Sequence, residues 1–168
     1  MVIFRCTGRV VRRFRIQPQD DVPALSGILG DWYVSLLNIG PTRLVLCQSE
    51  RSLLPVIIPA RNAPFPSAFA PALAAILQGL GIREDLVTRE VAASSEVAFS
   101  KPRSRRVLGA MNDFAFQAKG YFSTRPRADN TVAICLELAQ MPSRPIGYQS
   151  ADRLTAALFQ SGRLQLGM

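Results

Sequence analysis

The stretch Trp32–Pro59 reads WYVSLLNIGPTRLVLCQSERSLLPVIIP and carries the clearest β-strand signal in the chain. β-Branched and aromatic residues fill it, and a Gly-Pro-Thr break and a polar break divide it into three runs. Runs of this length joined by tight turns are typical of antiparallel strands. We therefore predict a three-stranded antiparallel meander over about residues 33–58. Pro55 lacks the N–H that a strand ladder needs, so the third strand is expected at a sheet edge.

Further strands and several helices are predicted around the meander. Val2–Cys6 is rich in β-branched and aromatic residues and predicts an N-terminal strand, and Glu96–Ser100 predicts another. Elsewhere apolar residues recur at helical spacing. The predicted helices cover about residues 7–15, 62–80, 83–91, 104–122, 130–140 and 151–160. The predicted fold class is therefore α+β, with the meander and an N-terminal strand packed against about five to six helices.

The length of 168 residues is close to that of one ordinary domain, and no repeat or low-complexity tract divides the chain. We predict a single domain over residues 1–168, on which residues 129–168 pack as a helical extension. No stretch has the length and apolar character of a membrane span, and the first residues do not resemble a secretory signal. We therefore expect a cytoplasmic protein.

The chain contains no histidine, which removes several kinds of chemistry. Ser-His-Asp and Cys-His catalysis, His-ligated zinc and imidazole pH switches all need that side chain. Cys6, Cys47 and Cys135 form no CxxC pair and have apolar neighbours. We expect these cysteines to be reduced and buried in the core. No metal site and no cofactor are predicted.

The charge balance is strongly basic. The chain carries 20 Lys and Arg against 12 Asp and Glu, a formal net charge of +8, and arginine supplies all but two of the cations. Such a balance speeds encounters with nucleic acid, acidic proteins or anionic membrane surfaces. Guanidinium groups bind phosphate through two parallel hydrogen bonds, which favours a phosphate-bearing partner. A GC-rich genome, whose codons favour arginine, explains the same excess without any partner.

The first basic cluster lies in the predicted helix at residues 7–15, which Thr7 is expected to cap. Arg9, Arg12 and Arg13 fall on one face of this helix, opposite its apolar side chains. Such a helix packs its apolar side on the domain and presents guanidinium groups outward, which suits phosphate contacts. The alternative is a solvated basic face, or pairing with the acids of the following loop.

A second cluster of four cations lies just before and at the start of the helix predicted from residue 104. It consists of Lys101, Arg103, Arg105 and Arg106. This position makes an anion cradle plausible, although the glycines and the Lys-Ser/Thr pair of a Walker A loop are missing. Cations at a helix N-terminus oppose the helix dipole, so a compensating group is needed. A bound phosphate would serve, and so would an ion pair to Asp113 or Glu96.

Two polar segments are candidate ligand or interface positions. They are Asp31, Trp32 and Tyr33 at the entrance to the meander, and Asn112 and Asp113 on the polar side of a helix. Trp and Tyr are common anchors at protein interfaces and stack on nucleobases. The alternative for the aromatic pair is a place at the edge of the core. The alternative for Asn112 and Asp113 is a structural hydrogen bond.

An enzyme without histidine is a further alternative. A carboxylate-metal nuclease needs two or three Asp or Glu side chains around one Mg²⁺. Asp31, Glu96 and Asp113 are its candidates if folding brings them together. The tight acid-x-Lys spacing of common nuclease cores is missing, and we predict no catalytic residue.

Five blocks of sequence together resemble a known family. They are Met1–Thr7, Leu29–Tyr33, Arg43–Leu46, Leu53–Val56 and Val107–Phe114. The Gly-Asp-Trp-Tyr and Met-Asn-Asp-Phe motifs within them are the most specific. Over most of residues 1–120 the chain resembles a family of small uncharacterised bacterial proteins, known only as a domain of unknown function. The resemblance implies an intact bacterial cytoplasmic domain and assigns no activity to any residue.

The sequence predicts a non-enzymatic bacterial cytoplasmic binding module with a basic, anion-attracting surface. An acidic or general protein partner fits slightly better than nucleic acid, because aromatic residues make up only 8% and no RNP, helix-turn-helix or zinc-finger pattern is present. Nucleic-acid binding through the arginine clusters is the first alternative, and a carboxylate-metal enzyme is the second. The sequence leaves open the oligomeric state and whether the two clusters share one surface.

Overall fold

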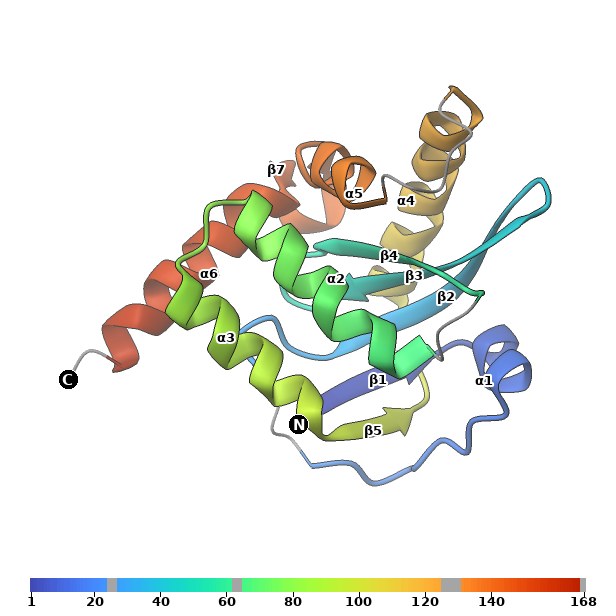
Figure 1. The fold of residues 1–168 in the computed structure, drawn as a ribbon, viewed down its shortest axis with the longest axis horizontal. Coiled ribbons are helices and arrows are strands. Elements are labelled where there is room, and N and C mark those ends of the chain that lie inside the picture. Colours follow the sequence, from blue (N-terminus) through green and yellow to red (C-terminus); the bar gives the residue numbers. More distant parts are fainter. Residues whose placement is uncertain (24–26, 62–64, 125–130, 167–168) are drawn as a thin grey trace.

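The computed structural model describes residues 1–23, 27–61, 65–124 and 131–166, with side chains up to residue 162. Within these residues the fold is α+β, with a five-stranded sheet, a two-stranded sheet and six α-helices (Figure 1). The strands of the large sheet are β1 (Val2–Cys6), β2 (Trp32–Ile39), β3 (Thr42–Ser49), β4 (Pro55–Pro59) and β5 (Val97–Ser100). The helices are α1 (Gly8–Phe14), α2 (Phe65–Gly79), α3 (Glu84–Ala92), α4 (Arg105–Thr124), α5 (Thr131–Ala139) and α6 (Ala151–Leu166). The small sheet pairs β6 (Pro142–Ser143) with β7 (Gln149–Ser150).

The large sheet has the strand order β4-β3-β2-β1-β5 and is mixed. β2, β3 and β4 pair antiparallel in chain order, which confirms the predicted meander as one part of the sheet. β1 pairs parallel with both β2 and β5, so the sheet joins the meander to the two further strands predicted at Val2–Cys6 and Glu96–Ser100. Parallel neighbours come from distant parts of the chain and leave no turn pattern between them, which is why the sequence did not predict this pairing. β4 lies at a sheet edge, as Pro55 predicts.

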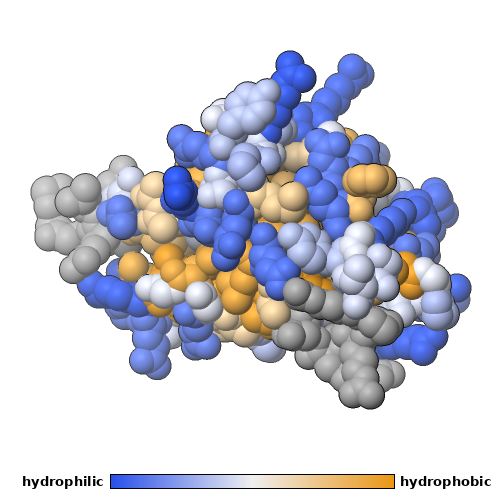
Figure 2. Space-filling view, turned by 90° about the horizontal axis from the view of Figure 1, so that it is seen from above, coloured by the Kyte–Doolittle hydropathy of each residue, from blue (hydrophilic) through white to orange (hydrophobic). Residues whose placement is uncertain are grey.

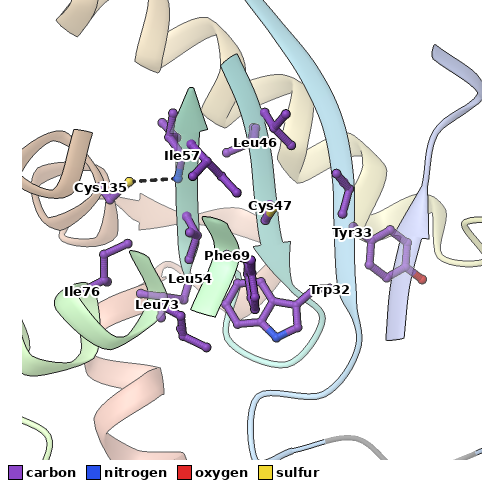
Figure 3. Close-up of a cluster of buried hydrophobic side chains, with 14 of the residues drawn as sticks. Trp32, Tyr33, Leu46, Cys47, Leu54, Ile57, Phe69, Leu73, Ile76 and Cys135 are labelled. Atoms are coloured by element: carbon purple, nitrogen blue, oxygen red, sulfur yellow. Dashed lines mark hydrogen bonds between the residues drawn. The ribbon is translucent and has the colours of Figure 1, made fainter. Parts of the chain in front are cut away.

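Helices cover both faces of the large sheet, with α2 in front of it and α4 behind it in Figure 1. Successive residues of a strand point to opposite faces, so each strand contributes to both layers. On the α2 side, the ring centroid of Phe69 lies 4.8 Å from that of Trp32 (Figure 3). On the α4 side, Tyr33 Oη accepts a hydrogen bond of 3.0 Å from the backbone N–H of Ser104.

The described helices form where apolar residues recur at helical spacing. The buried residues of α2 share one side of the helix and are Phe65, Phe69, Leu73, Ile76 and Leu77. They belong to a hydrophobic cluster that includes side chains from Val2 to Phe159. None of the described helices combines the length and apolar character needed to cross a membrane.

Two helix starts differ in how they are capped. Ser104 caps α4, because its Oγ accepts a hydrogen bond of 3.3 Å from the backbone N–H of Val107. Thr7 was expected to cap α1 but makes no side-chain capping bond. Its backbone N–H instead donates to the carbonyl of Val34 at 3.0 Å, so Thr7 still continues the pairing of β1 with β2.

The three cysteines are free thiols in the core, as predicted. Burial raises the pKa of Cys6 and of Cys135 to about 12, and raises the pKa of Cys47 well above its ordinary value. Cys135 Sγ accepts a hydrogen bond of 3.2 Å from the backbone N–H of Ile57 (Figure 3). The contact joins α5 to the edge strand β4.

The segment between α5 and α6 contains a short hairpin, formed by β6 and β7. β6 and β7 enclose a 3₁₀ turn (Arg144–Ile146) and two residues in left-handed conformation, Gly147 with φ +66° and Tyr148 with φ +61°. Glycine adopts such a backbone readily, whereas an aromatic residue does so at a cost in free energy. The hairpin therefore holds Tyr148 in a strained position.

Candidate anion-binding site

The first basic cluster stands on α1 as predicted, with its guanidinium groups exposed. Val10 is fully buried and holds this seven-residue helix on the sheet, whereas Arg9, Arg12 and Arg13 are exposed. A helix this short has little stability of its own, so packing of its apolar side positions these arginines.

Arg9 and Arg13, one helical turn apart, line a hollow of about 230 Å³ beside the β2–β3 hairpin. A third arginine, Arg43 of β3, also lines this hollow. The remaining lining residues are Leu36, Asn38 and Ala60. Arg12 does not line the hollow, so the structure divides the predicted cluster. We call the hollow of Arg9, Arg13, Arg43 and Asn38 the arginine hollow.

Arg43 was not among the candidate site residues predicted from the sequence. The signal for it lies in the hairpin register, which places Asn38 opposite Arg43 across β2 and β3. That register follows once the Gly40-Pro41 turn is fixed. The position of α1 above this end of the hairpin depends on the tertiary structure.

The arginine hollow is electrostatically uncompensated. No carboxylate lines it, and within the described part of the chain no ion pair involves Arg9, Arg13 or Arg43. The Arg13 guanidinium lies 5.9 Å from the ring centroid of Phe14, a cation–π contact that neutralises no charge. Three like charges around one small space create a positive potential that an oxyanion would relieve.

Most cations of the second basic cluster form ion pairs or hydrogen bonds within the chain. Arg103 Nη2 lies 3.4 Å from both Asp31 Oδ2 and Glu50 Oε1. Arg106 Nη1 donates a hydrogen bond of 2.8 Å to the carbonyl of Pro145. Lys101 Nζ lies 3.7 Å from Asp20 Oδ1, an exposed pair. Among the described residues the compensating acids at the start of α4 are thus Asp31 and Glu50, and no ion pair joins this cluster to Asp113 or Glu96, the acids that the sequence offered as alternatives to a bound phosphate.

The two clusters do not share a site. Arg103 lies beside Asp31, immediately before β2, whereas the arginine hollow includes Asn38 near the other end of that strand. Seven residues of extended chain span about 23 Å. This is more than twice the Debye length of about 8 Å at physiological ionic strength. The remaining exposed cation of the second cluster, Arg105, is therefore too far from the hollow to act with it.

Asp31 forms the most buried ion pair among the described residues. Its Oδ2 lies 2.9 Å from Arg5 Nε, and the two side chains are 6% and 8% exposed. Arg5 Nη1 also donates to Ser100 Oγ at 3.1 Å and to the carbonyl of Lys101 at 3.3 Å. The pair therefore ties β1 to the start of β2 and the end of β5, where α4 approaches the sheet.

The structure places the two candidate aromatic residues in the core. Trp32 is 1% exposed against Phe69, and Tyr33 is fully buried with its hydroxyl on the N–H of Ser104. In this position neither ring offers a surface to a partner. Asn112 and Asp113 are exposed on α4. Asp113 lines a different hollow, described below.

No metal site forms among the described residues. No group of three or more Cys, Asp or Glu side chains in that part of the chain is arranged to hold an ion. Asp31, Glu96 and Asp113, the candidates for a carboxylate-metal enzyme, do not come together in such a group. Asp31 instead faces Arg5 and Arg103.

Glu90 of α3 is a buried carboxylate that was not predicted from the sequence. It is 6% exposed and accepts hydrogen bonds from the backbone N–H groups of Ile28 at 2.8 Å and Leu29 at 3.1 Å. A Cβ at Gly27 would collide with the carboxylate of Glu90, so a larger residue there would displace that carboxylate. Burial raises the pKa of Glu90, while the two N–H groups and Arg51 oppose this rise. The carboxylate thus holds the loop that leads to Asp31.

Replacing Glu90 with glutamine is expected to change the pH dependence of stability. A carboxyl whose pKa is raised in the folded state binds its proton more tightly there than in the unfolded chain. The proton on Glu90 therefore contributes to the free energy of unfolding. This contribution is fully present below pH 4.5, the ordinary pKa of a glutamate, and is lost as pH rises through the raised pKa of Glu90. Urea unfolding at stepped pH should show the wild type losing free energy of unfolding relative to Glu90→Gln over this window.

Glu84→Gln is the matched control, because it removes a carboxylate from an exposed position on the same helix. Parallel pH profiles of the wild type and Glu90→Gln would contradict the prediction.

The comparison with known proteins agrees with the resemblance noted from the sequence. The chain matches the family described as "Domain of unknown function (DUF6933)" over residues 3–154, which is most of its length, and therefore belongs to that family. No curated protein matches the chain.

Proposed function

We propose that this member of the family of unknown function is a non-enzymatic binding module that holds an anionic group of its partner in the arginine hollow. The observation that supports the proposal is the convergence of Arg9, Arg13 and Arg43 on one space with no carboxylate lining it. Asn38 adds a neutral side chain that can donate to the same anion. Charge-assisted hydrogen bonds from guanidinium groups to an oxyanion are among the stronger ones in proteins.

An acidic segment of a protein fits this hollow better than nucleic acid does. Leu36 and Ala60 give the hollow an apolar part beside its charges. A side chain that ends in a carboxylate or phosphate can pack its aliphatic part there while its charged end contacts the arginines. The large hydrophobic side chains exposed in the described residues are Phe116 and Tyr148, and neither lines the hollow. Without an aromatic platform there is nothing for a nucleobase to stack on. The separation of the two basic clusters also leaves no continuous track for a nucleic-acid backbone.

We further propose that residues 1–168 act as one unit in the cytoplasm of a bacterium. The hydrophobic cluster that includes both Val2 and Phe159 supports a single unit. Three cysteines kept as free thiols are compatible with a reducing compartment.

Titration with a short glutamate-rich peptide tests the proposal. We expect Arg9→Ala, Arg13→Ala and Arg43→Ala each to weaken binding by about tenfold, since one charge-assisted hydrogen bond contributes about 1.5–3 kcal/mol. Isothermal titration calorimetry measures the affinities. Arg89→Ala is the matched control, because it removes the same charge from an exposed position on α3.

Equal losses in all four variants would mean that only net charge matters, which contradicts a defined site. A random-sequence DNA duplex titrated in parallel addresses the alternative. If DNA binds more tightly than the peptide, with the steep salt dependence of several released counterions, nucleic acid replaces the acidic protein as the partner.

A further inference from the structure

A second surface of the molecule is built differently from the arginine hollow. Phe116 on α4 is 80% exposed and Tyr148 in the β6–β7 hairpin is 70% exposed. Two adjoining hollows connect them, one of about 200 Å³ that Phe116 lines and a more open one of about 750 Å³ that Tyr148 lines. Pro142 lines both hollows. We call this surface the hairpin face and define it by Asp113, Phe116, Pro142, Arg144 and Tyr148.

The position of Tyr148 on the hairpin face requires a strained backbone. Tyr148 keeps φ at +61°, and its backbone N–H donates to the carbonyl of Ser143 at 2.9 Å. The hydrogen bond from Arg106 to Pro145 joins the hairpin to α4. An aromatic ring fixed in solvent by a strained backbone is better explained by contact with another molecule than by the stability of the isolated chain. The end of the molecule that carries β7 is seen in Figure 2, where hydrophobic side chains reach the surface between hydrophilic ones.

The polar groups of the hairpin face lack partners within the described part of the chain. Asp113 and Arg144 line the same hollow, yet no ion pair within 4.0 Å involves either of them. The Oε1 atom of Gln117, in the wall of this hollow, is buried without a hydrogen-bond partner. Asp113 and Arg144 therefore give the hollow an acid and a base that a second molecule can reach.

We propose that the occupant of the hairpin face is a second copy of this chain. A two-fold contact places the same patch on both sides, so the patch must be complementary to itself. The hairpin face meets this condition: Asp113 of one copy can pair with Arg144 of the other, and each copy offers both an exposed aromatic ring and a hollow. Chains of net charge +8 repel one another, so a contact between copies needs a face that carries both signs. A strongly acidic partner would instead be drawn to the arginine hollow.

Sedimentation velocity over about 1–200 μM protein, a range in which micromolar association is detected, tests the proposal. We expect a concentration-dependent dimer in the wild type. Phe116→Ser and Tyr148→Ser should each weaken it by about tenfold, as loss of an aromatic anchor does. Both side chains are exposed, so circular dichroism and the thermal midpoint at low concentration should match the wild type.

Exchanging the charges of Asp113 and Arg144 tests whether these two residues pair between copies. Asp113→Arg should weaken the dimer, and the double variant Asp113→Arg/Arg144→Asp should restore it, because the ion pairs between copies re-form with reversed sign. Gln78→Arg is the control for another face, since it adds a charge to the exposed side of α2, which carries none.

Arg43→Ala separates this proposal from the proposed function, because it should impair peptide binding and leave the dimer intact.

A wild type that stays monomeric at every concentration would overturn the proposal. So would a dimer that survives both aromatic substitutions, or one that Gln78→Arg dissociates.

Discussion

Replacing Asp31 with alanine is expected to lower the free energy of unfolding by about 3–5 kcal/mol, the range for loss of one partner from a buried ion pair. Asp31 and Arg5 are each less than a tenth exposed. Without the carboxylate, the acceptors left to the Arg5 guanidinium among the described residues are Ser100 Oγ and a backbone carbonyl, and neither carries the opposite charge. Arg103 loses one of its two carboxylate partners as well. Chemical denaturation of the wild type and Asp31→Ala measures the difference.

Two further variants show whether burial of the charge causes this loss. Asp85→Ala removes a partner that lies even closer to its arginine, Arg83, but that pair is half exposed, and we expect little change in stability. The double variant Arg5→Met/Asp31→Ala removes both charges and should be more stable than Asp31→Ala alone, since no unpaired charge then stays in the core. Similar losses for Asp31→Ala and Asp85→Ala would contradict the interpretation.

Replacing Phe69 with alanine is expected to lower the free energy of unfolding by about 3–5 kcal/mol, the range for truncating a buried phenylalanine. Phe69 is fully buried where α2 meets the sheet. Its ring makes an edge contact with Trp32 at 4.8 Å between centroids, and the two residues are labelled in Figure 3. A second edge contact joins it to Phe4 at 5.0 Å. Truncation leaves a cavity between the two rings that the rigid strands β1 and β2 cannot close. Thermal or urea unfolding measures the loss.

Phe116→Ala makes the same chemical change at a side chain that is 80% exposed. Measured at a protein concentration low enough to keep the chain monomeric, it should leave stability nearly unchanged. Phe69→Leu refills part of the cavity and should lose less than Phe69→Ala. Equal stability of Phe69→Ala and Phe116→Ala would contradict the packing described here.

Local sequence patterns were sufficient to predict the elements that leave a signature over a few residues. The alternation and breaks of Trp32–Pro59 indicated three strands, and the structure contains them as β2, β3 and β4. The apolar spacing of Phe69, Leu73 and Ile76 indicated a helix that the structure confirms as α2. The position of β1 between β2 and β5 was not predictable in this way, because no local signal records which distant strands become parallel neighbours.

The candidate site was predictable only in part, for the same reason. The exposure of Arg9 and Arg13 followed from the amphipathic pattern of α1. The contribution of Arg43 and the exclusion of Arg12 depended on how α1 packs over the hairpin. Glu90 lies 62 residues from Ile28, and nothing in its neighbourhood along the chain marks it as a buried acceptor.

The sequence by itself determined the basic character of the protein, the lack of imidazole chemistry, and the places where the strands of the large sheet and the helices form. These properties depend on composition and on periodicity within a few residues. Only the tertiary structure decided which arginines stay available to a partner. Arg103 lies close to Asp31 and Glu50, whereas Arg9, Arg13 and Arg43 face no carboxylate in the described part of the chain. A charge is neutralised by groups within a few ångströms in space, and such neighbours come together from distant parts of the chain only when it folds.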